Sequence, residues 1–223
     1  MAVRKEIIAT GEMYHVFNRS IDKQKIFKNK YDYTRMMELI RYYRFGKTPL
    51  RYSHFVRLKH DQKEMIYENL EKKKNQLVEI HAFCIMPNHF HFLLKPLVDN
   101  GLSTYINLIQ HSYAKYFNTK YHRKGVVFQG SFKVVHIEDE EQFVHVHRYI
   151  HLNPVTAFLI NMHDLDNYQW SSYPQMSTSI SHDNYIINDV IMSNFTSLEA
   201  YKKFLDDQVD YQRKLNILKK LLD

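Results

Sequence analysis

The 223-residue sequence has one cysteine, Cys84, five glycines, five prolines and no long apolar run. A single cysteine excludes an internal disulfide and is typical of a reducing compartment. Few glycines and prolines argue against a low-complexity chain. Without an apolar stretch of about 20 residues the sequence predicts no membrane-spanning helix, and we see no signal peptide. These absences predict a globular protein located in the cytoplasm.

Positive charge and aromatic side chains are abundant instead. The formal net charge is +7, and the chain holds 17 tyrosines and 14 phenylalanines. A basic, aromatic-rich chain is suited to a polyanionic partner, and nucleic acid is the first expectation. A merely soluble basic protein is an equally good interpretation of the charge alone.

Basic residues concentrate in one stretch, 41–60, which holds six Lys or Arg and no acidic residue. Such a stretch is either a phosphate-contacting surface or a solvated charged face. Including basic residues elsewhere, the candidate contacts to a nucleic-acid backbone are Arg19, Arg41, Arg44, Arg51, Lys115, Arg123, Lys124 and Lys133.

A histidine pair follows the turn-forming dipeptide Pro87-Asn88. If residues 89–95 form a strand, Phe90 and Phe92 share one face while His89 and His91 share the other. The two imidazoles would stand about 7 Å apart along the strand, a spacing that suits one divalent cation. A solvated strand face explains the spacing equally well, because 14 histidines make one such pair expected by chance.

Hydrophobic periodicity predicts an α+β fold. The expected order is strand, helix, strand, strand, helix, strand, helix, over residues 12–19, 31–43, 77–86, 89–95, 103–118, 132–137 and a helix that Pro154 ends at Asn153. This order predicts a ferredoxin-like antiparallel sheet with helices on one face. Further amphipathic helices are expected between residues 198 and 222, forming a C-terminal helical extension.

The last of the core helices carries Tyr149 and Asn153 on one ridge, because residues four apart lie one above the other. If that ridge faces the histidine pair, Asn153 could add an oxygen ligand, giving a set that suits Mg²⁺ or Mn²⁺. A phenol beside a metal-polarised phosphodiester could act as a nucleophile. An amphipathic tyrosine at a core edge is the more common role for any one of 17 tyrosines.

Six short segments, each weak alone, follow one another over residues 10–175: Tyr14–Arg19, Phe83–Leu94, Tyr113–Asn118, Gly125–Lys133, Arg148–Ala157 and Trp170–Tyr173. As a set they are specific, and the chain resembles the single-tyrosine HUH transposases, in particular the REP-associated tyrosine transposase branch. The resemblance implies that His89, His91 and Asn153 bind the divalent cation. It implies that Tyr149 attacks single-stranded DNA, forming a 5′-phosphotyrosine and freeing a 3′-hydroxyl.

Departures from the family pattern are few. Ser131 stands where many relatives have arginine, and Phe158 where they usually have glycine. A rival interpretation is a domesticated protein that binds single-stranded or hairpin DNA without cutting it. The intact set of His89, His91, Tyr149 and Asn153 favours the enzyme.

The resemblance also sets expectations for organisation. Residues 1–175 are expected to form the transposase domain, with a basic, charged helical insertion at about 44–76, and residues 176–223 the C-terminal extension. A homodimer is expected, because relatives exchange helices between subunits. A prokaryotic, cytoplasmic protein associated with the nucleoid when DNA-bound is implied.

Overall fold

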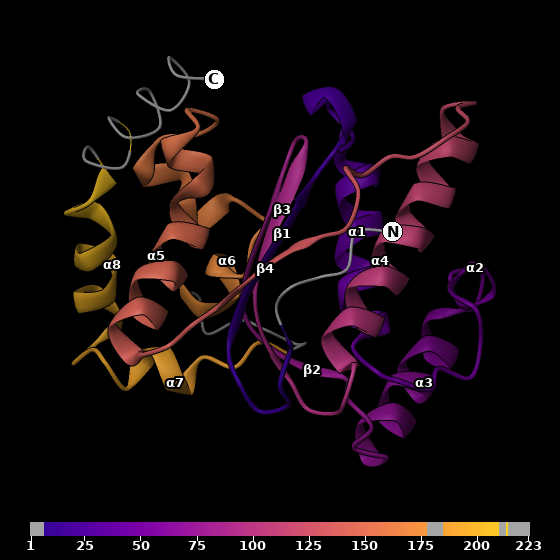
Figure 1. Ribbon diagram of the computed structural model, residues 1–223, viewed down its shortest axis with the longest axis horizontal. Coiled ribbons are helices and arrows are strands. Elements are labelled where there is room, and N and C mark those ends of the chain that lie inside the picture. The colour runs from indigo at the N-terminus through magenta and orange to yellow at the C-terminus, as the bar shows by residue number, and fades with distance from the viewer. Residues whose placement is uncertain (1–6, 178–184, 210–212, 214–223) are drawn as a thin grey trace.

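A four-stranded antiparallel sheet lies at the centre of the molecule (Figure 1). This computed structural model describes residues 7–177, 185–209 and 213. The strand order is β2-β3-β1-β4, and the strands are β1 (Tyr14–Arg19), β2 (Val78–Met86), β3 (His89–Pro96) and β4 (Lys133–His136). The predicted α+β class and antiparallel sheet are confirmed.

In the described ranges, four α-helices lie between strands along the chain and four follow β4. The α-helices are α1 (Lys30–Tyr43), α2 (Tyr52–Phe55), α3 (His60–Lys72), α4 (Gly101–Lys120), α5 (Glu140–Thr156), α6 (Tyr173–Ser177), α7 (Asp189–Met192) and α8 (Leu198–Asp206). Short 3₁₀ turns occupy Ile21–Lys23 and Met162–Asn167. Within the described ranges, no helix is long and apolar enough to cross a membrane.

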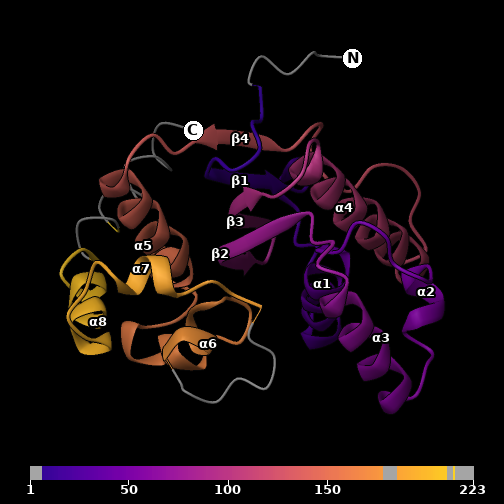
Figure 2. The same cartoon turned by 90° about the horizontal axis from the view of Figure 1, so that it is seen from below.

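Helices cover both faces of the sheet, which corrects the expectation of helices on one face only. α1 and α4 lie on one side and α5 on the other (Figure 2). The reason is visible in β2 and β3, which are buried almost continuously instead of alternating. Leu93 and Cys84 point toward α5 and pack with Ile150, while Phe90 and Phe92 belong to the core under α1 and α4. Continuous burial is typical of strands that are covered on both sides.

Helix α5 passes through Pro154 and ends at Thr156, three residues later than predicted. A proline in a helix removes the N–H that would donate to the carbonyl four residues earlier, here that of Ile150. The side chain of Asn153 compensates in part, because its Nδ2 lies 2.8 Å from the Tyr149 carbonyl oxygen and 3.5 Å from that of Ile150. The helix therefore keeps Tyr149 and Asn153 in regular geometry up to its last turn.

The turn after α5 contains a non-glycine residue in the left-handed region, Phe158, with φ of 60°. The resemblance described above leads us to expect glycine at this position. A left-handed conformation costs an L-residue about 1–2 kcal/mol, and the entropy of glycine offsets part of that cost. We expect Phe158→Gly to raise the free energy of unfolding by about 0.5–1 kcal/mol, measured by urea denaturation. An unchanged or lower stability would show that the contact of Phe158 with Arg213 (5.1 Å from ring centroid to guanidinium) matters more.

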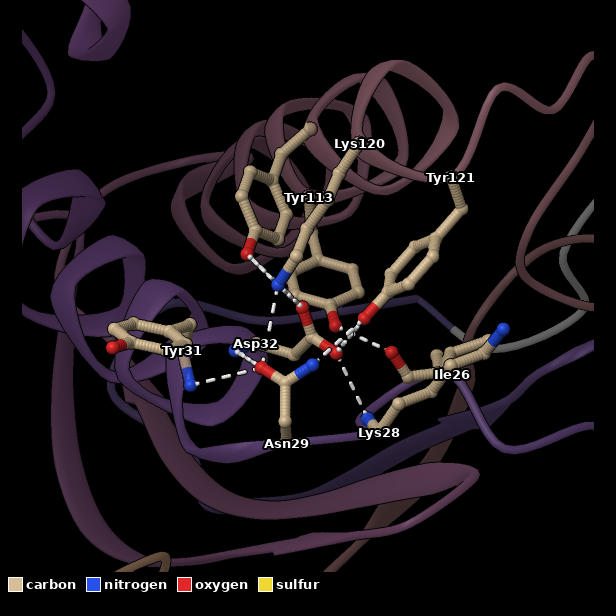
Figure 3. Close-up of polar contacts among 9 residues, drawn as sticks. Ile26, Lys28, Asn29, Tyr31, Asp32, Tyr113, Lys120 and Tyr121 are labelled. Atoms are coloured by element: carbon tan, nitrogen blue, oxygen red, sulfur yellow. Dashed lines mark hydrogen bonds and ion pairs between the residues drawn. The ribbon is translucent and has the colours of Figure 1, made fainter.

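A buried carboxylate fastens α1 to the end of α4. Asp32 accepts hydrogen bonds from Lys120 Nζ at 2.6 Å, Tyr121 Oη at 2.7 Å, Tyr116 Oη at 3.0 Å and the Lys28 backbone at 2.9 Å. Figure 3 shows Asp32 with Lys120, Tyr121 and Lys28, beside Asn29, the N-cap residue of α1. The segment leading into α1 is thereby held in place, and that segment contacts the turn between β2 and β3.

The C-terminal extension is attached through α8. Tyr201 Oη lies 2.8 Å from His147 Nδ1 and 3.0 Å from His151 Nδ1, both on α5. His151 Nε2 in turn lies 2.7 Å from Ser172 Oγ. These buried contacts fasten α8 to α5, and His147 also reaches the sheet, with Nε2 3.3 Å from the His81 carbonyl oxygen on β2. The part of the predicted extension beyond residue 209, Arg213 apart, lies outside the described residues.

Candidate metal and tyrosine site

The histidine pair lies on the sheet face that looks toward α5. In the β1–β3 register, His89 is opposite Arg19 and His91 is opposite Phe17. The two imidazoles are perpendicular, with ring centroids 5.1 Å apart. His91 is 6% exposed and His89 is half-buried. The alternation predicted for residues 89–95 therefore places both rings on one face, and that face is not simply solvated.

Tyr149 comes to this face from α5 of the same chain. Its ring meets His91 edge-on, with centroids 5.4 Å apart, and it is 38% exposed. The predicted ridge thus faces the histidine pair. A phenol, two imidazoles and solvent access come together within one subunit, so no exchanged helix is needed to form the group.

Both imidazoles of the pair are uncharged at neutral pH. Burial, together with the nearby Arg19 guanidinium, lowers the pKa of His89 to about 4. Burial and the neighbouring His89, His15 and Arg19 hold the pKa of His91 well below its usual value. Neutral imidazoles keep a lone pair, and the pair on one face fits a borderline divalent cation such as Mn²⁺.

The phenol of Tyr149 is protonated at neutral pH. Burial raises its pKa above the usual value, while the Arg19 charge and the Asn153 amide act in the opposite direction. A protonated phenol is a weak nucleophile. Any reaction at Tyr149 would therefore need its proton removed as the new bond forms, beside positive charge that stabilises the phenolate.

Asn153 is placed beside Tyr149 and is 7% exposed. Its Nδ2 donates back to helix α5, so the oxygen Oδ1 is the atom left to serve as a ligand. Within the described part of the chain, no three His, Cys, Asp or Glu side chains form a metal-binding group. Asn153 stays the predicted third ligand beside His89 and His91.

Comparisons with known proteins found a sequence family and a solved structure that this chain resembles. Residues 48–153, just under half of the chain, match the sequence model of the family described as "Transposase IS200 like". The resemblance to these transposases is confirmed. A solved structure of a REP-associated tyrosine transposase bound to a REP hairpin aligns with a TM-score of 0.54 and 16% identity, covering 90% of this chain and 96% of that chain. At that identity the match shows a shared fold. No curated protein matched significantly.

One residue of this site escaped the sequence argument. His15 on β1 lies between the predicted groups, with Nε2 3.0 Å from His91 Nδ1 and its ring centroid 5.9 Å from that of Tyr149. Strand alternation puts His15 on the face opposite to the buried Tyr14 and Val16. The missing signal was the pairing of β1 with β3, which a single sequence does not reveal.

The predicted DNA-contacting residues fall into two groups. Arg19 is exposed, and its positive charge acts to lower the pKa values of His89, His91 and Tyr149. Lys133 is exposed on β4, with Nζ 6.0 Å from the Phe17 ring that in turn stacks on His91. Both lie at the edge of the site formed by His15, His91 and Tyr149.

The remaining basic candidates lie away from it. Arg44 is buried and ion-paired with Glu71, so the structure gives it a structural role in place of the predicted DNA contact. Arg41 lies over the Tyr67 ring at 3.7 Å. Exposed Arg51 begins α2, exposed Lys115 lies on α4, and Arg123 and Lys124 follow α4. These last four stay predictions as contacts to a DNA backbone.

Proposed function

We propose that this chain is a transposase that cuts and rejoins single-stranded DNA with Tyr149 as the nucleophile, His89, His91 and Asn153 as ligands of Mg²⁺ or Mn²⁺, and a hairpin as the preferred DNA. The single observation that carries this proposal is the contact of the Tyr149 ring with His91 within one chain. The family match and the hairpin-bound neighbour support the substrate class.

The reaction follows from the atoms in place. Tyr149 Oη attacks the phosphorus of a phosphodiester, its proton leaves to solvent or a bound base, and the bond from phosphorus to the 3′ oxygen breaks. That oxygen takes up a proton and becomes a free 3′-hydroxyl, while the 5′ side stays bonded to Tyr149. The bound cation would supply charge stabilisation at the phosphate. Because the phosphotyrosine conserves the bond, a second 3′-hydroxyl can reverse the step and join a new strand.

Arg19 is suited to hold the phosphate during this step. It is the charged residue opposite His89 in the sheet, and it lowers the pKa of Tyr149. A guanidinium aimed at a phosphate can form two parallel hydrogen bonds, which positions the phosphorus as well as stabilising charge. The homodimer and the nucleoid location stay predictions, and Tyr149 meets His91 within one subunit.

The test is incubation of the purified chain with single-stranded hairpin DNA and Mn²⁺. We expect a covalent protein–DNA band on a denaturing gel, together with a released strand that ends in a 3′-hydroxyl. A protein that binds hairpin DNA but forms no band under any divalent cation would be a domesticated binding protein. Turnover by water, with release of both strands and no covalent band, would instead indicate a phosphodiesterase.

A second expectation concerns Arg19 and pH. Removing its charge in Arg19→Ala takes away a group that lowers the pKa of Tyr149. The pKa of the phenol then rises, so the alkaline limb of the rate of adduct formation should move to higher pH, and the rate at pH 7 should fall about 10–100-fold. Arg19→Lys should keep part of the rate. Lys72→Ala, which removes an exposed positive charge in the last turn of α3 that is not among the predicted DNA contacts, is the matched control. An unshifted pH profile in Arg19→Ala would contradict this role.

A further inference from the structure

The ring orientation of a ligating histidine is set by the partner of its other nitrogen. We propose that Asn88 and His15 are positioning residues that hold Nδ1 of His89 and Nδ1 of His91, so that both rings present Nε2 to the cation. This inference rests on the proposed function for its metal, but the hydrogen bonds themselves are properties of the metal-free protein.

Asn88 fixes the tautomer of His89 through a chain of two contacts. Asn88 Nδ2 donates to the Lys23 carbonyl oxygen at 2.9 Å, which requires the amide nitrogen on that side. The amide oxygen Oδ1 then faces His89 Nδ1 at 2.6 Å. An amide oxygen can only accept, so Nδ1 of His89 carries the proton. The lone pair of His89 is therefore on Nε2.

The turn that carries Asn88 is itself held firmly. The Asn88 carbonyl accepts from the Ser20 backbone at 2.8 Å. The Pro87 carbonyl accepts from the backbones of Ile26 at 2.9 Å and Phe27 at 3.0 Å. Three backbone hydrogen bonds from the segment before α1 anchor a two-residue turn. Asn88 is therefore a fixed acceptor and not a mobile side chain at a loop tip.

His15 has the equivalent place for His91. Its Nε2 lies 3.0 Å from His91 Nδ1, and the two rings are within 22° of parallel. Two ring nitrogens at this distance share one proton, so one ring donates and the other accepts. If His91 donates, its Nε2 has the lone pair that a cation needs. If His15 donates, His91 has an N–H at Nε2 and cannot ligate. A bound cation selects the first arrangement, in which His15 Nδ1 carries a proton.

The two positioning residues come from different elements, β1 and the β2–β3 turn, yet give the same result on neighbouring rings. Each contacts Nδ1 of its histidine, so Nε2 is the nitrogen that could bind a cation. With Nδ1 engaged on both rings, whose centroids are 5.1 Å apart, Nε2 is the nitrogen of each ring that would be available to a cation. Partners of this kind typically contribute 10–100-fold to metal affinity.

The first test needs no metal. ¹⁵N spectra of the imidazoles in the metal-free protein, assigned with His89→Gln and His91→Gln, report which nitrogen of each ring carries the proton. We expect an Nδ1–H, Nε2 lone-pair tautomer for His89, and its loss in Asn88→Ala. A predominantly Nε2–H tautomer for His89 in the wild-type protein would overturn the inference for Asn88 without touching the proposed function.

The second test measures Mn²⁺ affinity by electron paramagnetic resonance on full-length protein. His15→Leu and Asn88→Ala should each weaken binding about 10–100-fold. His15→Gln should stay near wild type, because its amide can accept where Nε2 accepted, and the exposed His111→Leu on α4 is the control for loss of a histidine. Thermal denaturation checks that each variant folds.

The outcomes separate the two claims. Wild-type affinity in both His15→Leu and Asn88→Ala overturns the positioning roles while the metal site stands. Equal loss in His15→Leu and His15→Gln would show that His15 is required as an imidazole, and overturns its role as an acceptor. Failure of the wild-type chain to bind Mn²⁺ in the presence of hairpin DNA overturns the proposed metal site, whatever the tautomers prove to be.

Discussion

Replacing Tyr149 with phenylalanine is expected to abolish the covalent protein–DNA adduct while the chain still binds hairpin DNA. Removing the nucleophile of a covalent mechanism typically costs several orders of magnitude, so the rate of adduct formation should fall by at least about 1,000-fold. The substitution keeps the ring that contacts His91 and His15. It deletes only a hydroxyl on a residue that is 38% exposed, so stability should change by less than about 1 kcal/mol.

The matched control for Tyr149→Phe is Tyr113→Phe. Tyr113 is another tyrosine on a long helix, but it is fully buried and its hydroxyl donates to the Ile26 carbonyl at 2.7 Å. Losing that hydrogen bond should lower stability by about 1 kcal/mol and leave adduct formation intact. An adduct that survives Tyr149→Phe, on gels and by mass spectrometry of the DNA-linked peptide, would overturn the assignment of the nucleophile.

Mixing two inactive variants tests which subunit each group serves. In the structure Tyr149 meets His91 of its own chain. A mixture of Tyr149→Phe with His91→Ala should therefore form no adduct. Restored activity would mean that α5 is exchanged between subunits in the active assembly, with a tyrosine from one chain reaching the imidazoles of the other.

Local patterns were sufficient to predict most elements and the core of the candidate site. Alternation placed His89 and His91 on one face, and the four-residue spacing put Tyr149 and Asn153 on one ridge. Both arguments use only the periods of a strand and a helix. They hold because each stays within one element, where the geometry of the backbone alone decides which side chains are neighbours.

Features that depend on pairing between distant segments were missed. The contact of His15 with His91 needs the β1–β3 register, and the burial of Arg44 needs Glu71 from another helix. Coverage of the second sheet face by α5 is likewise a packing outcome. Helix α4 begins at Gly101, two residues before the helix expected over 103–118. A Cβ at Gly101 would lie 2.5 Å from the Leu77 carbonyl oxygen, and this close approach of a distant segment is likewise absent from any local pattern.

The contacts around Asp32 connect stability to the site. Asp32 is fully buried and is shared by the end of α4 and the segment before α1, and that segment donates the backbone hydrogen bonds that hold Pro87. Burial alone would raise the pKa of Asp32, but hydrogen bonds from Lys120, Tyr121 and the Lys28 backbone together lower it below its usual value. The carboxylate is therefore ionised in the folded protein at neutral pH, and its negative charge strengthens the hydrogen bonds that it accepts.

Asp32→Asn should be strongly destabilising. The amide keeps the size of the side chain but turns one acceptor into a donor that faces the donors now bound to Asp32, and Lys120 loses its counter-charge. Removing one member of a buried pair costs about 3–5 kcal/mol. Because the Lys120 side chain is 29% exposed, we expect the low end, about 3 kcal/mol, which for a chain of this length is a fall in Tm of about 6–12 °C.

The control for this loss is Asp166→Asn, which removes a carboxylate from an exposed pair with Lys202 at 3.1 Å and should cost less than about 1 kcal/mol.

The pH dependence gives a second check. Because the folded-state pKa of Asp32 lies below its unfolded value of 3.8, its contribution is complete above that value and is lost as pH falls through the folded pKa. The difference in Tm between wild type and Asp32→Asn should therefore be constant at neutral pH and shrink below about pH 4. A loss in the free energy of unfolding under about 1 kcal/mol at pH 7, or a Tm difference that grows on acidification, would show that the buried carboxylate does not hold α1 to α4.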